Sequence, residues 1–268
     1  MKIIEIKSKS ILTLSKLGSF TLNPYIGCQH ACLYCYATYI GKWKNPEKAW
    51  GTWVFVKINA PEILEKELQK YPPSSVFIST VCDAYQPVEK RYQITRRCLE
   101  RFIQYPSWQI SLLTKSDLVL RDLDLFKKIP QIEIGFSITT TDDNLAKIFE
   151  PYSSRPSKRI EALKKLKKEG VKTRVAINPI LPYFTDPKEA LKKMVLTFSK
   201  IGVDGLGFDK MNYLDGRVGK RLRPIYAKFG QKALNWLEYA KTQEYGEALR
   251  LEIEKVTKDI NIPYQIYF

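Results

Sequence analysis

Short hydrophobic stretches rich in β-branched and aromatic residues recur along the chain and predict strands at 17–22, 54–58, 75–80, 109–114, 132–139, 171–180 and 203–208. Between them, apolar residues spaced three or four positions apart predict helices at about 60–70, 95–104, 118–128, 158–169 and 187–202. Strands that alternate with helices favour a parallel sheet covered by helices. With 54–58 interpreted as an insertion, the other six strands predict an α/β fold, a partial (β/α)6 TIM-like barrel.

Polar residues and glycines mark several predicted helix ends. Asn59 is a predicted N-cap of the helix at 60–70. Asp186 precedes Pro187 and Glu189 in the pattern of a capping box with proline at the first helical position. Gly170 is typical of a left-handed helix end. These signals place the helix boundaries independently of the hydrophobic pattern.

Neither a linker nor a repeat divides the chain of 268 residues, a length that α/β barrels often occupy as one unit. We therefore expect a single domain over 1–268. Its core should lie at about 17–210, with a short N-terminal extension and a C-terminal extension at about 211–268. A hydrophobic content of 44% is enough for a sizeable core.

The formal charge of +16 comes from 44 basic and 28 acidic residues, and such an excess attracts phosphate backbones or anionic membrane surfaces. A solvated Lys/Glu-rich surface is the simpler interpretation, but such a surface would carry nearly equal numbers of basic and acidic residues. No apolar run reaches the roughly 18 residues of a membrane span, and the first ten residues do not resemble a signal peptide. Five cysteines, an odd number, favour a reducing compartment, so we expect a cytoplasmic protein without a membrane partner.

Three of the five cysteines, Cys28, Cys32 and Cys35, lie within eight positions in the spacing C-x3-C-x2-C. Thiolates this close select iron–sulfur clusters, zinc or copper(I). An ordinary 4Fe–4S carrier takes four cysteines, so three leave one iron without a protein ligand. His30, the only histidine, offers the alternative of a Cys3His zinc site, although structural zinc sites usually join two separated ligand pairs. Cys98 lies on the apolar face of its helix and is a predicted core residue.

The motif and several later blocks resemble the radical S-adenosylmethionine (SAM) superfamily, in its spore photoproduct lyase-like (DNA repair photolyase-like) branch. The resemblance covers about residues 20–185. Its blocks, in order, are Asn23-Pro24-Tyr25 with Gly27, the cysteines, Asp83-Ala84-Tyr85-Gln86-Pro87 with Glu89, Thr95-Arg96, Thr114-Lys115-Ser116, Arg121-Asp122, Phe136-Ser137-Ile138-Thr139-Thr140, Glu150-Pro151, and Arg159 with Glu161-Ala162.

The resemblance implies a 4Fe–4S cluster held by the three cysteines, with SAM chelated to the open iron. It also implies that Lys115 and Ser137 contact the SAM carboxylate and that Tyr34 packs by the cluster and adenine. The alternative for Lys115 is a solvated lysine at a strand end, and the alternative for Ser137 is a helix cap. For Tyr34 the alternative is ordinary core packing. A low-potential electron donor such as flavodoxin or ferredoxin is an implied partner.

The sequence departs from the lyase at two places. The lyase has its hydrogen-donating cysteine where Thr80 stands here, and Cys82 lies two positions later, a displacement of roughly 6–7 Å along a strand. Lys57 or Phe55 replaces a radical-relay tyrosine. Cys82 and Tyr85 are therefore the candidate residues for returning or relaying hydrogen, and a buried small side chain is the alternative for Cys82.

A basic cluster after the last predicted strand combines Arg217, Lys220, Arg221 and Arg223 with Tyr213 before it and Tyr226 after it. Arginines among aromatics suit phosphate contacts and base stacking, and a solvated loop is the alternative. The working hypothesis is a radical SAM enzyme that acts on nucleic acid, as a DNA-lesion lyase or repair enzyme does. Radical SAM modification of tRNA or a peptide is one alternative, and a non-catalytic, zinc-stabilised nucleic-acid-binding protein is another.

Overall fold

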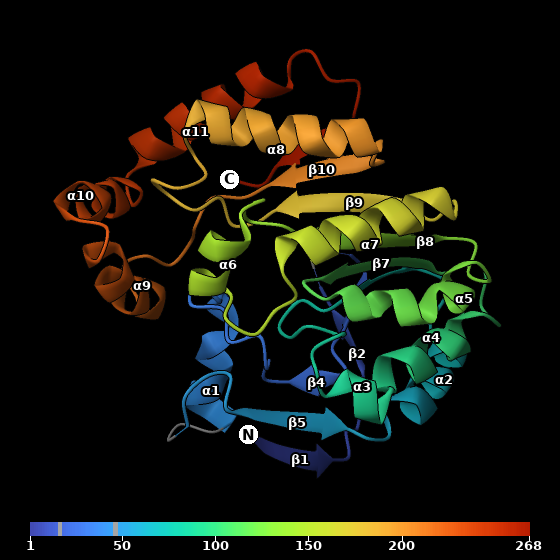
Figure 1. Cartoon of the computed structure of the whole chain (residues 1–268). Coiled ribbons are helices and arrows are strands. Elements are labelled where there is room, and N and C mark those ends of the chain that lie inside the picture. The colour runs from blue at the N-terminus through green and yellow to red at the C-terminus, as the bar shows by residue number, and fades with distance from the viewer. Residues whose placement is uncertain (16–17, 45–47) are drawn as a thin grey trace.

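The computed structural model describes residues 1–15, 18–44 and 48–268. Within these residues the larger sheet has eight strands in the order β11-β10-β9-β8-β7-β6-β3-β2 (Figure 1). Neighbouring strands from β11 to β3 are parallel, whereas the edge strand β2 pairs antiparallel with β3. The strands are β2 (Leu12–Leu14), β3 (Phe20–Leu22), β6 (Ser75–Ile78), β7 (Gln109–Thr114), β8 (Ile132–Ser137), β9 (Lys172–Ile177), β10 (Gly205–Phe208) and β11 (Tyr264–Ile266).

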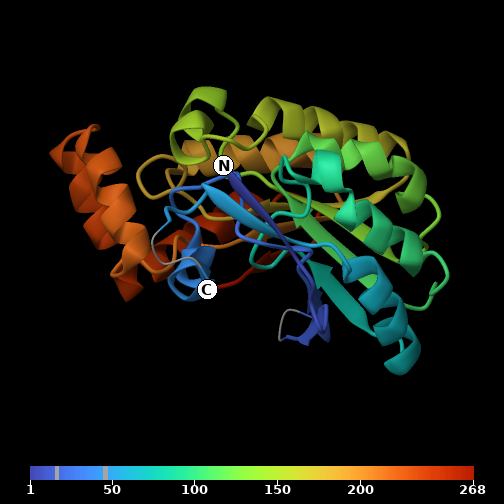
Figure 2. The ribbon, with the colours of Figure 1, turned by 90° about the horizontal axis from the view of Figure 1, so that it is seen from below.

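Strands β3, β6, β7, β8, β9 and β10 are the six that the sequence predicted, so the partial (β/α)6 barrel within an α/β fold is confirmed. The first of them begins at Phe20, and Leu17 lies outside the described residues. Helices follow the strands and cover one face of the sheet (Figure 2). They are α2 (Ala60–Lys70), α3 (Glu89–Tyr92), α4 (Ile94–Phe102), α5 (Leu123–Phe126), α6 (Asp143–Phe149), α7 (Pro156–Lys168) and α8 (Lys188–Ile201).

A second sheet of three strands lies beside the barrel and has the order β1 (Lys2–Ile6), β5 (Trp53–Lys57), β4 (Tyr25–Ile26). The predicted insertion at 54–58 is β5, which pairs parallel with β1 and antiparallel with β4 and lies outside the larger sheet. Because β4 directly precedes the cysteines, the small sheet holds the start of the cysteine loop. The loop then continues into η1 (Tyr36–Thr38) and α1 (Tyr39–Lys44).

Two predicted caps are wrong in the role of the side chain. Asn59 precedes α2, but its amide exchanges hydrogen bonds with the backbone of Ser8 (2.9 and 3.1 Å) instead of capping the helix. The Asp186 carboxylate accepts from Trp236 Nε1 (2.5 Å) and Tyr245 Oη (3.1 Å), so α8 starts without a side-chain cap. In both cases a partner distant in the sequence takes the polar group that local rules assign to the helix end.

The predicted helix at 118–128 is also divided. A 3-10 helix, η2 (Asp117–Asp122), comes first and α5 follows it. Asp122 is fully buried and accepts from Tyr85, Arg96 and Arg121, which fixes this segment in the tighter turn. The predicted core residue Cys98 is fully buried in α4, and Gly170 ends α7 with a φ of +77°, both as expected.

The C-terminal extension contains α9 (Arg217–Ala227), α10 (Gln231–Tyr239), α11 (Gln243–Thr257) and β11. The predicted basic segment is therefore a helix, α9, rather than a loop. Helix α10 packs on α9, α11 packs on α8, and β11 adds to β10 at the edge of the larger sheet. No helix in the described part of the chain is long and apolar enough to cross a bilayer.

Candidate functional site

Parallel strands deliver their following loops to one side of a barrel, which is where active sites of such folds lie. In Figure 1 the arrowheads of β9 and β10 point to the side where α6 and α9 lie, and the cysteine loop joins them there. The loops after β3, β6, β7, β8 and β9 interlock at this side through hydrogen bonds between residues distant in the sequence. The site is therefore assembled from the ends of five barrel strands.

Two glycines let the cysteine loop lie close against the small sheet. Gly27 has a φ of +89°, and a Cβ there would lie 2.7 Å from the carbonyl oxygen of Trp53. Gly51 has a φ of +91°, and a Cβ there would lie 2.3 Å from the Cβ of Ala31. Gln86 holds the loop from the other side, because its side chain accepts from the amide of Gln29 (2.9 Å) and donates to the carbonyl of Gly27 (3.2 Å). The loop conformation is thus set by its surroundings.

The three cysteines of the motif are free thiols in one loop. Cys28 and Cys32 are buried and Cys35 is half-buried. Burial raises the pKa of all three thiols, because a thiolate in an apolar site is costly. Thiolate ligands therefore need the positive charge that a metal centre supplies, and a set of three thiols fits a cluster with one open iron. Within the described residues, no group of three or more His, Cys, Asp or Glu side chains surrounds a single-ion site.

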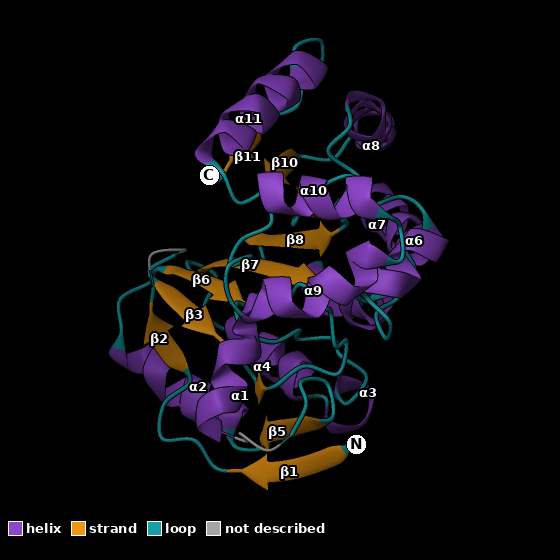
Figure 3. Ribbon diagram, turned by 90° about the vertical axis from the view of Figure 1, so that its left-hand side faces the viewer, coloured by secondary structure: helices purple, strands orange, loops and turns teal. Residues whose placement is uncertain are grey.

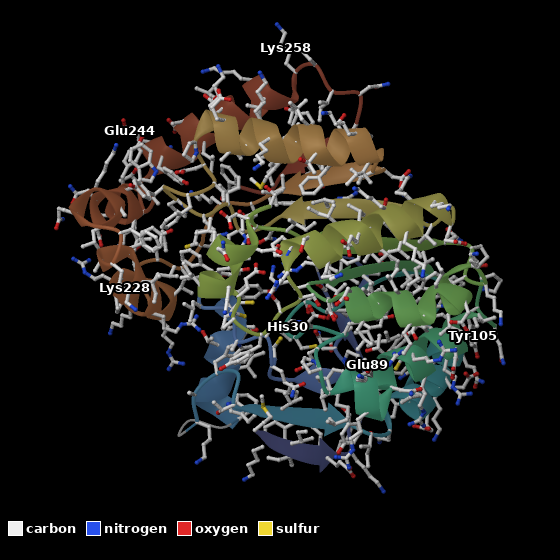
Figure 4. All side chains as sticks on the ribbon, in the orientation of Figure 1. His30, Glu89, Tyr105, Lys228, Glu244 and Lys258 are labelled. Carbon is white, nitrogen blue, oxygen red and sulfur yellow. The ribbon has the colours of Figure 1, made fainter. Side chains whose placement is uncertain are left out.

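The lone histidine is engaged by protein groups and not by the cysteines. The Nδ1 atom of His30 lies 3.1 Å from the carbonyl oxygen of Tyr152, and Nε2 lies 3.2 Å from Asp83 Oδ2. Figure 4 shows His30 in the middle of the molecule, between the barrel and the small sheet. With both ring nitrogens facing other partners, the arrangement does not support the Cys3His zinc alternative.

Asp83 connects the histidine with the end of β7. Its carboxylate accepts from Thr114 Oγ1 (2.7 Å) and from the backbone amide of Lys115 (2.7 Å). Burial opposes ionisation, but the nearby His30 and these hydrogen bonds outweigh it and lower the pKa of Asp83 to about 2. The ionised carboxylate fixes the backbone from which the Lys115 side chain extends.

The three residues predicted to contact SAM, namely Tyr34, Lys115 and Ser137, lie together and form the predicted SAM-contact group. Lys115 Nζ donates to Ser137 Oγ and lies 5.5 Å from the centre of the Tyr34 ring. Ser137 Oγ in turn donates to the carbonyl of Asn178 (2.9 Å). The Lys115 side chain is 12% exposed, so its cation is shielded but reachable. A shielded ammonium beside a hydroxyl is suited to a carboxylate ligand.

A buried carboxylate that the sequence reading gave no role organises this group. Glu150 Oε1 accepts from Tyr34 Oη and from Thr139 Oγ1 (2.9 Å) and lies 3.5 Å from Lys115 Nζ. The other oxygen accepts from the fully buried guanidinium of Arg159. Burial opposes ionisation, yet Arg159 and Lys115 hold the pKa of Glu150 well below its usual value.

The only sequence signal for Glu150 and Arg159 was their place in the blocks of the resemblance. Arg159 lies on α7, in a helix with a repeating lysine pattern, so its burial was not predictable from composition. Its Nη1 atom donates to the carbonyl of Ser137 (2.8 Å) and so holds the backbone of one residue of the SAM-contact group. Tertiary structure, and not local pattern, identifies this pair.

The two residues predicted for hydrogen return or relay have different surroundings. Cys82 is half-buried, with its Sγ atom 3.6 Å from Asn23 Oδ1, and burial raises its pKa to about 12. Tyr85 is fully buried, and its hydroxyl donates to Asp122 Oδ2 (2.9 Å), away from the cysteines. The predicted catalytic part for Tyr85 is therefore not supported by its position. Thr80, at the place of the lyase cysteine, is held by the side chain of Asn23.

The basic helix α9 contacts the cysteine loop directly. Arg221 Nη2 donates to the carbonyl oxygen of Cys35 (2.8 Å), and burial lowers the pKa of this guanidinium. Tyr213, 68% exposed, stacks on Tyr36 with ring centres 6.2 Å apart. The predicted stacking role of Tyr226 is wrong, because this residue is fully buried and donates to the carbonyl of Pro182.

Related sequences include an uncharacterized protein of Methanocaldococcus jannaschii that is 44% identical over 188 residues, which covers 69% of this chain and 70% of that protein. An uncharacterized protein of Acidianus two-tailed virus is 32% identical over 197 residues, covering 69% of this chain and 64% of that protein. Uncharacterized mycobacterial proteins are 29% identical, and the match spans 57% of their length.

Solved structures with the same fold include spore photoproduct lyase complexed with dinucleoside spore photoproduct, with a TM-score of 0.72, 14% identity and coverage of 99% of this chain and 82% of that chain. A mutant of that lyase with bound AdoMet and the same dinucleoside has a TM-score of 0.71 at 15% identity, with the same coverage. SuiB of Streptococcus suis bound to S-adenosylmethionine has a TM-score of 0.57 at 15% identity, covering 92% of this chain and 50% of that chain.

These structures confirm the predicted resemblance to the spore photoproduct lyase-like branch at the level of the fold. The Radical SAM superfamily itself matches residues 22–195, which include the three cysteines, Lys115, Ser137 and the Glu150–Arg159 pair. This chain therefore belongs to the radical SAM superfamily.

Proposed function

We propose that this protein is an enzyme that holds a 4Fe–4S cluster on Cys28, Cys32 and Cys35 and reductively cleaves SAM to a 5′-deoxyadenosyl radical, which then abstracts hydrogen from a nucleic-acid substrate. The observation that carries the proposal is the position of Lys115, with Ser137 and Tyr34, beside a loop of three cysteines at the strand ends. Membership of the superfamily supports the same cofactor and co-substrate.

The cluster, when bound, supplies the electron and the open iron that this chemistry needs. The chain's own residues bind and orient the co-substrate. Lys115 provides a shielded cation for the SAM carboxylate, and Ser137 provides a hydroxyl beside it. Glu150 keeps both Lys115 and Tyr34 in place through the contacts described above, and its own charge is neutralised mainly by Arg159. An electron donor such as flavodoxin or ferredoxin would reduce the cluster.

A nucleic-acid substrate is supported by the charge of +16 and by the basic face of α9 next to the exposed Tyr36–Tyr213 stack. The complex of spore photoproduct lyase with dinucleoside spore photoproduct has the same fold, which favours a reaction of lyase or repair type. Cys82, half-buried beside Asn23, is the candidate for returning a hydrogen atom. Its high pKa suits that part, because hydrogen-atom transfer needs the thiol and not the thiolate.

The cysteine assignment is tested by anaerobic reconstitution of the purified protein with iron and sulfide, followed by reduction in the presence of SAM. We expect a brown protein with about four irons per chain that forms 5′-deoxyadenosine. Cys32→Ala should abolish both properties. Cys98→Ala is the matched control, because this thiol is fully buried in α4 and away from the loop. Formation of 5′-deoxyadenosine by the Cys32 variant would contradict the proposal.

The substrate class is tested separately by the amount of 5′-deoxyadenosine formed with irradiated DNA, tRNA or a peptide extract. Stimulation by DNA supports the repair-type reaction, whereas stimulation by tRNA or peptide alone replaces it with a modification reaction. Metal analysis addresses the non-catalytic alternative. One zinc per chain and no iron after anaerobic reconstitution would favour a zinc-stabilised binding protein.

A further inference from the structure

A cavity of about 390 Å³ is lined by residues of α1, of α9 and of the segment between α1 and β5. The helices α1 and α9 lie near each other in Figure 1 and in Figure 3. Lys48, Arg217, Lys220 and Arg221 line it together with Trp50. Small-molecule pockets have volumes of about 300–1,000 Å³, so this cavity has room for a ligand larger than a single ion. Neither the barrel interior nor the SAM-contact group includes these residues.

The four cations are gathered on one concave surface without a described carboxylate among them. Among the residues that the structure describes, no carboxylate lines the cavity, and none of the four cations forms an ion pair with an acidic side chain. By contrast, Arg223, on the same helix, pairs with Glu238. Four unpaired positive charges around one concave surface repel each other, and a bound anion relieves this repulsion. The cavity is therefore suited to phosphate groups.

Arg221 is the strongest indication of a ligand, because it is half-buried and no described carboxylate lies beside it in the cavity. Its Nη2 atom donates to the carbonyl of Cys35 (2.8 Å), and its Nε atom donates to the carbonyl of Arg217 (3.4 Å), so within the described residues its hydrogen bonds go to neutral oxygens. A guanidinium presents five donors in a rigid fork, and phosphate is a group that uses two of them at once. Trp50 adds an aromatic wall, and stacking on such a wall is worth about 1–3 kcal/mol per base in other proteins.

We propose that this cavity is a nucleotide subsite, which holds the phosphate and base of a nucleotide next to the reacting one in a single-stranded or locally opened substrate. The proposal rests on the nucleic-acid substrate proposed above and gives it a location. Because Arg221 contacts the carbonyl of Cys35, the flanking nucleotide would lie one side chain away from the loop that holds the cluster. Binding in the cavity then fixes the position of the neighbouring nucleotide at the strand ends.

The subsite is tested by fluorescence anisotropy with a labelled single-stranded oligonucleotide and the full-length, cluster-reconstituted protein at 50–200 mM salt. The double variant Arg217→Ala/Lys220→Ala should bind at least tenfold more weakly than the unchanged protein. Its slope of log affinity against log salt should fall by about 1.4, the value for two phosphate contacts on a single strand. Lys164→Ala/Lys165→Ala removes the same charge from the exposed face of α7 and should change affinity less than twofold.

A third variant separates stacking from charge. Trp50→Leu should weaken binding without changing the salt slope, since a base–aromatic contact releases no counter-ions. Equal losses in the α7 control and the α9 double variant would overturn the subsite, because binding would then follow net charge alone. An unchanged affinity in the α9 double variant would overturn it as well.

Failure of the proposed substrate class is distinguishable from failure of the subsite. If the unchanged protein binds no oligonucleotide, the nucleic-acid proposal is wrong, and calorimetric titration with AMP and pyrophosphate then decides on the cavity. Binding of either compound that the Arg217→Ala/Lys220→Ala variant loses would keep a phosphate-ligand cavity, whereas no binding of either would overturn it.

Discussion

Replacing Glu150 by glutamine removes one charge from the SAM-contact group while keeping its size. Glutamine's carbonyl oxygen still accepts from Tyr34 and Thr139, but the amide nitrogen that replaces the other oxygen faces Arg159 with a donor. Glu150 and Arg159 have fully buried side chains. Removing one partner of a buried ion pair costs about 3–5 kcal/mol, because the other charge stays buried without compensation. We expect the free energy of unfolding to fall by that amount.

Urea unfolding of the reduced, cluster-free protein at pH 7 measures this cost through the transition midpoint. Glu161→Gln is the matched control on α7. It breaks an exposed pair with Lys158, in which both side chains are more than half exposed, and should cost less than about 0.5 kcal/mol. A loss below about 1 kcal/mol for Glu150→Gln would refute the view that an ionised carboxylate holds this group together.

The pH dependence of the same variant gives a second test. The pKa of Glu150 is lowered by folding, so its contribution is present above the unfolded pKa of about 4.3 and is lost as the pH falls toward the folded value. The difference between the unchanged protein and Glu150→Gln should therefore be largest near neutral pH and shrink in acid. A difference that grows as the pH falls below about 4 would contradict the assigned direction.

Three further variants test other parts of the structure. Gly51→Ala should lower the iron content after reconstitution, since the added Cβ would lie 2.3 Å from that of Ala31. Gly170→Ala is the control, because Gly170 has a φ of +77° but no atom within 4 Å of an added Cβ. It should cost about 1 kcal/mol of stability and leave the iron content unchanged. Burial raises the pKa of Asp209 to about 6, so its ionisation in the folded state costs stability as the pH rises above about 4. In thermal unfolding, Asp209→Asn should stabilise the protein by about 2 kcal/mol at pH 7.5 and by less at pH 4. An equal effect at both pH values would contradict the direction of this pKa shift. Arg221→Gln removes a cation of α9 that contacts the cysteine loop. It should make the midpoint potential of the proposed cluster more negative in a redox titration followed by electron paramagnetic resonance. An unchanged potential would show that the guanidinium does not influence the cluster.

The barrel was predictable because its strands are hydrophobic segments that alternate with amphipathic helices, a pattern that local sequence records directly. The three cysteines stand out as predicted metal ligands because thiols in that spacing carry the chemistry themselves, whereas Lys115 was identified only by its place in a block of the family resemblance. Local rules failed where a distant partner takes a polar group, as Trp236 does with the carboxylate of Asp186. They also do not indicate that the hydroxyl of Tyr85 donates to Asp122, which lies 37 positions later in the chain.

Glu150 and Arg159 show the limit of the sequence most clearly. Each is a charged residue type that is usually exposed. Both are buried here because they form an ion pair with each other next to Lys115 and Tyr34. His30 is a similar case. Its place between cysteines offered a zinc site only as the alternative, and the contacts that engage its ring come from Asp83 and Tyr152, which are far away in the sequence. Such roles depend on chain topology, which no short segment encodes.

The hydrogen bond between Arg221 and the carbonyl of Cys35 spans 186 positions of the chain. A nascent polypeptide that has passed the cysteine motif still lacks this donor until most of the protein has left the ribosome. The strand β11, which pairs with β10, is completed later still. The cysteine loop therefore reaches its full set of contacts only late in synthesis, and under the proposed function its three thiols would be exposed to oxidation until α9 has packed against them.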